Sequence, residues 1–224
     1  MKSYRFYLIP VPPFRLDFTV WALRRRRENA VDGWDGETYR RVLPLERGAA
    51  AVAVRQTRPV DRPRLEVRVT GAGANASTKS AVTAALERLL GLRIDLAEFY
   101  RFASSNPRLD RLATRFRGMK PPRFPSVFEA LVNAIACQQV TLTLGIQLLN
   151  KVAARYACSS DDGSMHAFPR PEDLAARRPG DFRRLGFSRQ KGQAIVELAR
   201  SITSGQTDLE GLADEDDDTA VEQL

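Results

Sequence analysis

Cysteine and histidine are scarce in this sequence of 224 residues, which contains two Cys and one His. A Cys₄ or Cys₂His₂ zinc site therefore cannot form within one chain, and we expect no bound metal. Two cysteines are too few for a disulfide framework, which predicts a reducing, cytoplasmic location. The single histidine, His166, lies in a loop-like stretch of Ser, Asp and Gly. Such a loop is a poor place for the oriented base of a Cys–His hydrolase.

Long apolar segments are also absent. Residues Met1 to Pro13 lack the apolar core of a signal peptide, so we expect none. The longest uncharged run, residues 130–150, contains seven Asn, Gln and Thr side chains. That polarity predicts a buried pair of helices in a soluble protein with no membrane association.

Positive charge is abundant and unevenly distributed. The sequence has 35 Lys and Arg against 27 Asp and Glu, a net charge of +8, and only five of the basic residues are Lys. Arginine favours bidentate contacts with phosphate, which indicates a polyanionic partner. Residues 1–120 have 24 basic and 12 acidic side chains, and residues 121–224 have 11 and 15. A Pro-rich stretch lies at this change, so we predict domains at 1–115 and 126–224 with a linker at 116–125.

Hydrophobic periodicity predicts an α+β fold, with a small sheet packed against one or two helices followed by an all-α part. Helices are expected at Leu16–Arg26 and at Thr78–Leu90, where Gly91 is a stop. The predicted strands are Tyr4–Ile9, Tyr39–Leu45, Ala50–Gln56 and Leu65–Thr70. The later helix signals are capping boxes at Asp95–Glu98 and Ser126–Glu129, Asn106-Pro107, Arg170-Pro171, the segment Pro179–Leu185 closed by Gly186, a Ser188 cap, and a last helix from Asp214.

Two neighbouring amides, Gln138 and Gln139, end the predicted helix Phe128–Cys137, and Thr141 can cap the next helix. Consecutive residues of a helix point about 100° apart, so both amides cannot be buried without hydrogen-bond partners. At a corner between helices they could reach a base edge or a minor groove. A hydrogen bond between the helices explains them equally well, and the pattern alone leaves both interpretations open.

Four other segments could carry chemistry, although an ordinary structural role is favoured for each. Arg24–Arg27 could hold DNA phosphates, but a solvated helix end is favoured. In Gly186–Lys191, backbone N–H groups with Arg189 or Lys191 could bind an anion, but a Gly stop and a Ser cap are favoured. Gly71–Ala74 lacks the third glycine of a dinucleotide site and predicts a turn. The consecutive acids Asp214–Asp218 spread around a helix and do not converge on a metal.

Five stretches, which occur in the order of one known family and cover nearly the whole chain, carry a resemblance. They are Phe14–Arg27, Trp34–Arg41, Phe128–Thr141, Phe168–Leu174 and Leu185–Ala199. The more specific are Ala134–Thr141 and the later GFSRQK segment. Together they resemble the DNA-3-methyladenine glycosylase II group of the helix-hairpin-helix base-excision DNA glycosylases.

The resemblance implies a TATA-binding-protein-like N-terminal α/β domain followed by the first part of an all-α glycosylase domain. It implies double-stranded DNA with alkylated bases as the partner, base flipping, hydrolysis of the N-glycosidic bond and no cofactor. Gln139 matches the wedge that fills the gap left by the flipped nucleotide, and Gln138 lies beside it near the base pocket. Thr141, Arg189 and Lys191 complete the set of DNA-binding residues that we predict.

The hairpin, the W-T-A stretch and the catalytic aspartate of that family would follow Leu224. We therefore assign no catalytic residue in this chain and expect the chain alone not to excise 3-methyladenine. The apolar faces Phe128–Ile135 and Ile195–Ile202 would then be partly uncovered, which predicts self-association. Two other interpretations stay open: a non-catalytic DNA-binding module or decayed glycosylase, and a helical interaction protein whose charge only keeps it in solution.

Overall fold

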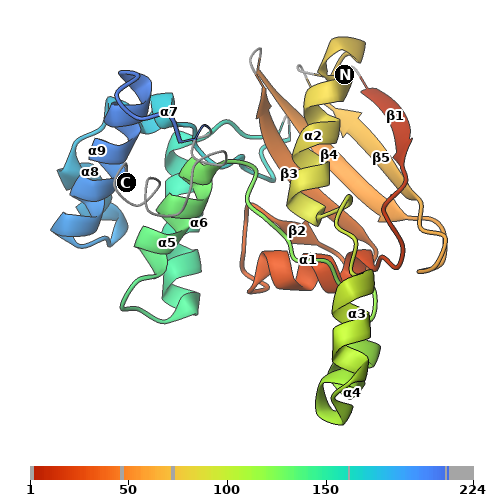
Figure 1. Ribbon diagram of the computed structural model, residues 1–224. Coiled ribbons are helices and arrows are strands. Elements are labelled where there is room, and N and C mark those ends of the chain that lie inside the picture. Colours follow the sequence, from red (N-terminus) through yellow and green to blue (C-terminus); the bar gives the residue numbers. More distant parts are fainter. Residues whose placement is uncertain (1–2, 46–47, 72–73, 161, 210, 212–224) are drawn as a thin grey trace.

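The computed structural model describes residues 3–45, 48–71, 74–160, 162–209 and 211 (Figure 1). A sheet with two helices comes first and a bundle of helices follows, which confirms the predicted mixed fold class. In chain order the elements are β1 (Ser3–Leu8), α1 (Leu16–Arg24), β2 (Gly33–Trp34), β3 (Thr38–Leu45), β4 (Gly48–Gln56), β5 (Leu65–Thr70), a 3₁₀ turn η1 (Ala76–Thr78), α2 (Lys79–Leu90), α3 (Ala97–Ser104), α4 (Pro107–Arg115), α5 (Val127–Cys137), α6 (Leu142–Tyr156), α7 (Pro171–Ala175), α8 (Pro179–Leu185) and α9 (Arg189–Thr203). The predicted helix from Asp214 lies outside the described residues.

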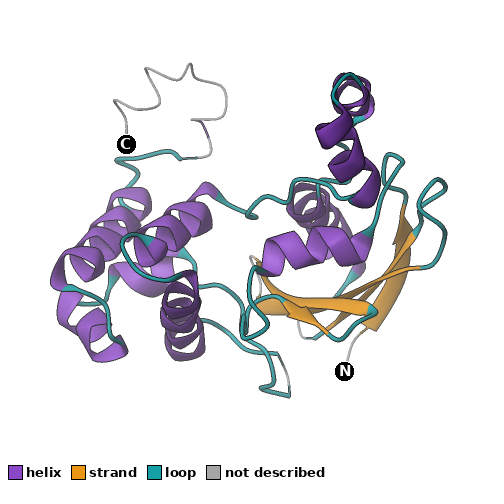
Figure 2. Ribbon diagram, turned by 90° about the horizontal axis from the view of Figure 1, so that it is seen from below, coloured by secondary structure: helices purple, strands orange, loops and turns teal. Residues whose placement is uncertain are grey.

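The five strands form an antiparallel sheet in the order β1-β5-β4-β3-β2. Alternate side chains of β5, namely Leu65, Val67 and Val69, are buried, while Arg68 between them is exposed. Helices α1 and α2 cover the apolar face of the sheet, as Figure 2 shows. This packing fixes the position of the end of α1. The residues that follow this end form part of the candidate site.

The paired helices α3 and α4 extend away from the sheet (Figure 1). Asn106 caps α4 by accepting hydrogen bonds from two backbone N–H groups, with Pro107 at the first helical position, as predicted. The predicted capping box before α3 is wrong. Asp95 accepts from the N–H of Ala97 at 2.8 Å, but Glu98 approaches Arg101 at 3.7 Å and does not reach back to the cap.

Helices α5 to α9 surround a second apolar cluster, separate from the one beneath the sheet. Ser126, Thr141 and Ser188 cap α5, α6 and α9 by accepting a backbone N–H, each at 3.2 Å. Between α5 and α9 lies an open surface cavity of about 700 Å³, to which Leu131 and Ile135 contribute. The predicted self-association and the predicted domain limits stay predictions.

A buried charged cluster joins the sheet to the helices. Arg41 of β3 donates to Asp32 at 2.7 Å and to both carboxylate oxygens of Glu129 on α5 at 2.7 and 2.6 Å. The Tyr39 hydroxyl donates to Asp32 at 2.7 Å. The predicted capping box Ser126–Glu129 is therefore only half formed, because the Glu129 carboxylate turns toward Arg41. Within the described ranges no helix is long and apolar enough to cross a membrane.

Candidate nucleic-acid interface

The loop that joins α5 to α6 presents two amide side chains to solvent. Gln138 and Gln139 are both exposed, and neither side-chain amide has a hydrogen-bond partner among the described residues. The interpretation as a hydrogen bond between the helices is therefore wrong. Gln139 also has a φ of +52°, in the left-handed region that residues other than glycine rarely adopt. Such strain persists only where the surrounding structure enforces it, and it is concentrated at functional sites.

Lys191 of α9 binds the backbone of this loop and of the end of α5. Its Nζ donates to the carbonyl of Ala136 at 3.1 Å and to that of Gln138 at 2.5 Å. These carbonyls belong to the last turn of α5 and to the residue that follows it, where a cation is favourable. The structure thus gives the half-buried Lys191 a role in positioning the loop. Arg189, two residues earlier, is exposed at the start of α9 and free to approach a ligand.

The two helices that carry the loop meet at a very close contact. Gly145 of α6 lies against Cys137 of α5, and a Cβ at Gly145 would be only 2.6 Å from the Cys137 Sγ. Thr141 is committed to capping α6, since its hydroxyl accepts from the N–H of Leu144. The glycine contact, the cap and Lys191 together restrict the loop, so its exposed amides project from a rigid base.

The arginine run at the end of α1 reaches the same two helices. Arg25 donates to the side-chain oxygen of Asn133 on α5 at 2.6 Å, and Arg26 donates to the hydroxyl of Thr143 on α6 at 3.2 Å. The expectation of a purely solvated helix end is therefore wrong. α1 ends at Arg24, and the run continues as a turn packed between the sheet and the helical part. Nothing in the local sequence pattern could reveal contacts between residues more than 100 positions apart.

The remaining candidates are the single histidine and two segments that lie wholly or partly outside the described part of the chain. His166 is half-buried and forms an isolated antiparallel bridge with Ser159, and no group of three His, Cys, Asp or Glu among the described residues could hold a metal ion. Asp214–Asp218 lie outside the described residues, as does the middle of Gly71–Ala74. The absence of a metal and of a cofactor stays a prediction.

Comparison with known proteins shows what the helical part of the chain is similar to. Residues 132–223 match the family described as HhH-GPD superfamily base excision DNA repair protein. The DNA-3-methyladenine glycosylase of Bacillus subtilis (strain 168) is 29% identical over 120 residues, which are 53% of this chain and 40% of the relative. The DNA-3-methyladenine glycosylase 2 of Escherichia coli (strain K12) is 32% identical over 101 residues, 45% and 36% of the two chains.

Residues 132–223, less than half of the chain, are similar to the HhH-GPD superfamily. The matches span less than half the length of either curated relative. All five predicted site residues fall inside residues 132–223, the range that matches the family.

Solved structures share the fold of this chain. A 3-methyladenine DNA-glycosylase from Archaeoglobus fulgidus superposes with a TM-score of 0.82 at 24% identity, covering 98% of this chain and 73% of the other. The apo-form 8-oxoguanine glycosylase/lyase of Clostridium acetobutylicum superposes with a TM-score of 0.65 at 15% identity, covering 99% and 72%. At these identities the likeness shows a common fold.

Proposed function

We propose that this chain is the DNA-recognition part of a base-excision DNA glycosylase that hydrolyses the N-glycosidic bond of alkylated bases such as 3-methyladenine. Its partner is double-stranded DNA, and its place is the cytoplasm. The names of the two curated relatives support the substrate class. The observation that carries the proposal is Gln139, an exposed side chain on strained backbone at the tip of a rigidly held loop.

The proposed role of the loop follows from the mechanics of base flipping. Extruding a nucleotide leaves a gap in the stack, and the unpaired base opposite would collapse into it unless a side chain fills the space. Gln139 supplies the filler, and its amide can donate to and accept from the edge of the widowed base. Gln138, beside it, faces the extruded nucleotide. Arg189, at the start of α9, contacts a phosphate.

We also propose that the chain consists of two domains joined by a connecting segment. The sheet with α1 and α2 forms a TATA-binding-protein-like α/β domain, and residues 116–125 connect it to the helical glycosylase domain. Residues 119–125 contain no helix or strand in the structure, which supports this division. No cofactor takes part, because the cationic alkylated base is already a good leaving group.

The test compares binding of the chain to a duplex containing an abasic site and to the same duplex intact, by fluorescence anisotropy. Gln139→Ala should weaken binding to the abasic duplex at least tenfold and change binding to the intact duplex little. Gln206→Ala is the matched control, since Gln206 is an exposed amide at the far end of α9. Equal losses on both duplexes would show that Gln139 is no wedge. If the chain fails to bind DNA even at low salt, it is a helical interaction protein instead.

A further inference from the structure

The turn after α1 runs alongside α6 and brings two arginines next to the loop that carries Gln139. Arg26 bonds to Thr143, in the first turn of α6. Two turns further along the same helix, Asn150 donates to the carbonyl of Glu28 at 2.5 Å and accepts from the N–H of Ala30 at 2.9 Å. The segment is therefore fixed at both ends, with its arginines at the loop end of α6.

The four arginines of the run divide into two pairs. Arg24 and Arg25 are half-buried and committed to the protein: Arg24 donates to the carbonyls of Trp34 and Arg27, and Arg25 donates to Asn133. Arg26 and Arg27 are exposed, and no carboxylate of the described residues forms an ion pair with either. The guanidinium of Arg27 has no hydrogen-bond partner in that part of the chain. The inner pair anchors the turn, and the outer pair faces solvent with its charge uncompensated.

Backbone strain marks the same place. Among the described residues, only Arg25 and Gln139 combine a side chain with a positive φ, at +61° and +52°. Gln139 lies in the loop between α5 and α6, and Arg25 lies far away in sequence, just after α1. The segment that contains Arg25 contacts both α5 and α6, through Asn133 and Thr143. With a φ of +61° and a ψ of −36°, Arg25 turns the chain sharply at the end of α1, and Arg26 beyond it donates to Thr143. Strain that recurs on both sides of one surface indicates a functional constraint.

We propose that Arg26 and Arg27 hold backbone phosphates of the same DNA duplex that Gln139 enters, so that the sheet part and the helical part form one continuous DNA-binding face. Planar guanidinium groups with no internal carboxylate partner suit phosphate oxygens. Phosphate contacts fix the position of a protein on the duplex without reading its sequence. The arginines thereby set the register at which the wedge meets the damaged position. This inference rests on the proposed function and extends it to the N-terminal part.

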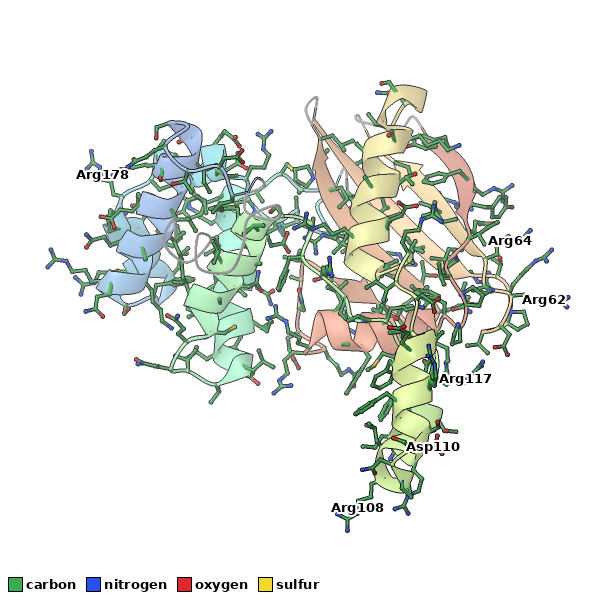
Figure 3. The ribbon with its side chains drawn as sticks, viewed as in Figure 1. Arg62, Arg64, Arg108, Asp110, Arg117 and Arg178 are labelled. Atoms are coloured by element: carbon green, nitrogen blue, oxygen red, sulfur yellow. The ribbon has the colours of Figure 1, made fainter. Side chains whose placement is uncertain are left out.

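The salt dependence of binding tests the inference, measured as the slope of log Kd against log salt concentration on the abasic duplex. Each phosphate contact contributes about 0.9 to that slope. Arg26→Ala/Arg27→Ala should therefore lower the slope by about 1.8 relative to wild type. The control is Arg58→Ala/Arg62→Ala, which removes two exposed arginines from the β4–β5 loop. Arg62 lies on the side of the sheet away from the helical part (Figure 3).

A charge reversal separates phosphate binding from a change in local structure. Arg27→Glu removes no side-chain hydrogen bond or ion pair of the described residues and keeps the carbonyl that accepts from Arg24, so it should leave the unfolding midpoint unchanged and weaken DNA binding more than Arg27→Ala. Slopes that are equal in the two double variants would overturn the inference while leaving a Gln139 effect, and with it the proposed function, intact. A wild-type chain that does not bind DNA would overturn both.

Discussion

Gln139 is the residue at which, under the proposed function, backbone stability and DNA binding make opposite demands. A left-handed conformation costs a residue with a Cβ about 1 kcal/mol, and glycine adopts it freely. The neighbouring Gln138 has a φ of −62° and carries no such strain. The chain keeps a large amide at the strained position, although glycine would fit the backbone better, which accords with a wedge that needs its side chain.

We predict opposite outcomes for glycine at these two neighbours. Gln138→Gly should lower the free energy of unfolding by about 0.5–1 kcal/mol, because it only adds freedom to the unfolded chain. Gln139→Gly should be more stable than Gln138→Gly by about 1 kcal/mol, because the strain is relieved. Urea unfolding followed by circular dichroism measures both. Equal destabilisation would mean that the backbone at Gln139 is not strained in solution.

Lys191 should act on the loop without touching DNA. Lys191→Met retains the apolar stem but removes the bonds to the carbonyls of Ala136 and Gln138. We expect faster hydrogen exchange of the amides at 138–141, a weaker preference for the abasic duplex, and recovery in Lys191→Arg, which restores a donor. If Lys191→Met instead reduces binding to intact and abasic DNA equally, with unchanged exchange, then Lys191 contacts phosphate directly.

Glu129 should make stability depend on pH in an unusual direction. Burial raises the pKa of this carboxyl above its ordinary value of 4.5, although Arg41 opposes the shift. The folded chain then keeps the proton of Glu129 to higher pH than the unfolded chain does. The contribution of this proton to the free energy of unfolding is therefore largest below pH 4.5 and is lost as pH rises through the raised pKa.

Glu129→Gln removes this titration and preserves an acceptor for Arg41. The urea midpoint of wild type minus that of Glu129→Gln should therefore decrease as the pH rises above 4.5. A difference that increases with pH would show that the attraction of Arg41 outweighs burial and lowers the pKa.

At the scale of elements, the crossing of α5 and α6 supports the loop between them. Gly145→Ala would place a methyl group 2.6 Å from the Cys137 Sγ and 3.2 Å from its Cα. We predict a loss of about 1–3 kcal/mol in the free energy of unfolding, because the helices must separate. Gly180→Ala on α8, where nothing lies within 4 Å of the added group, should be neutral or stabilising. Cys137→Ala should recover part of the loss, and strictly additive effects of the two substitutions would contradict the contact.

The elements themselves were largely predictable, because they follow from local patterns. The bounds of β5 and α8 agree with the prediction, since clean alternation defines the strand and a proline and a glycine delimit the helix. β2 escaped prediction because two residues show no period. Glu129 was assigned to a capping box because of its local spacing from Ser126, whereas its partner Arg41 lies 88 positions away.

At the scale of the molecule, the sequence indicated the exposed amides and their resemblance to a wedge, but not the surface around them. The positions of Arg26 and Lys191 depend on contacts with residues 117 and 53 positions away, which no periodicity encodes. Packing of the sheet against the helices, through Arg41 and Glu129, brings those segments together. The candidate interface is thus a product of the junction between the two parts of the chain.

The most direct test is to place a photoreactive diazirine at the abasic position of a duplex, irradiate its complex with the unmodified chain, and identify the labelled peptides by mass spectrometry. The account predicts labelling concentrated on residues 138–141, at the tip of the α5–α6 loop. Labelling spread evenly over the chain, or concentrated on the β4–β5 loop, would contradict it.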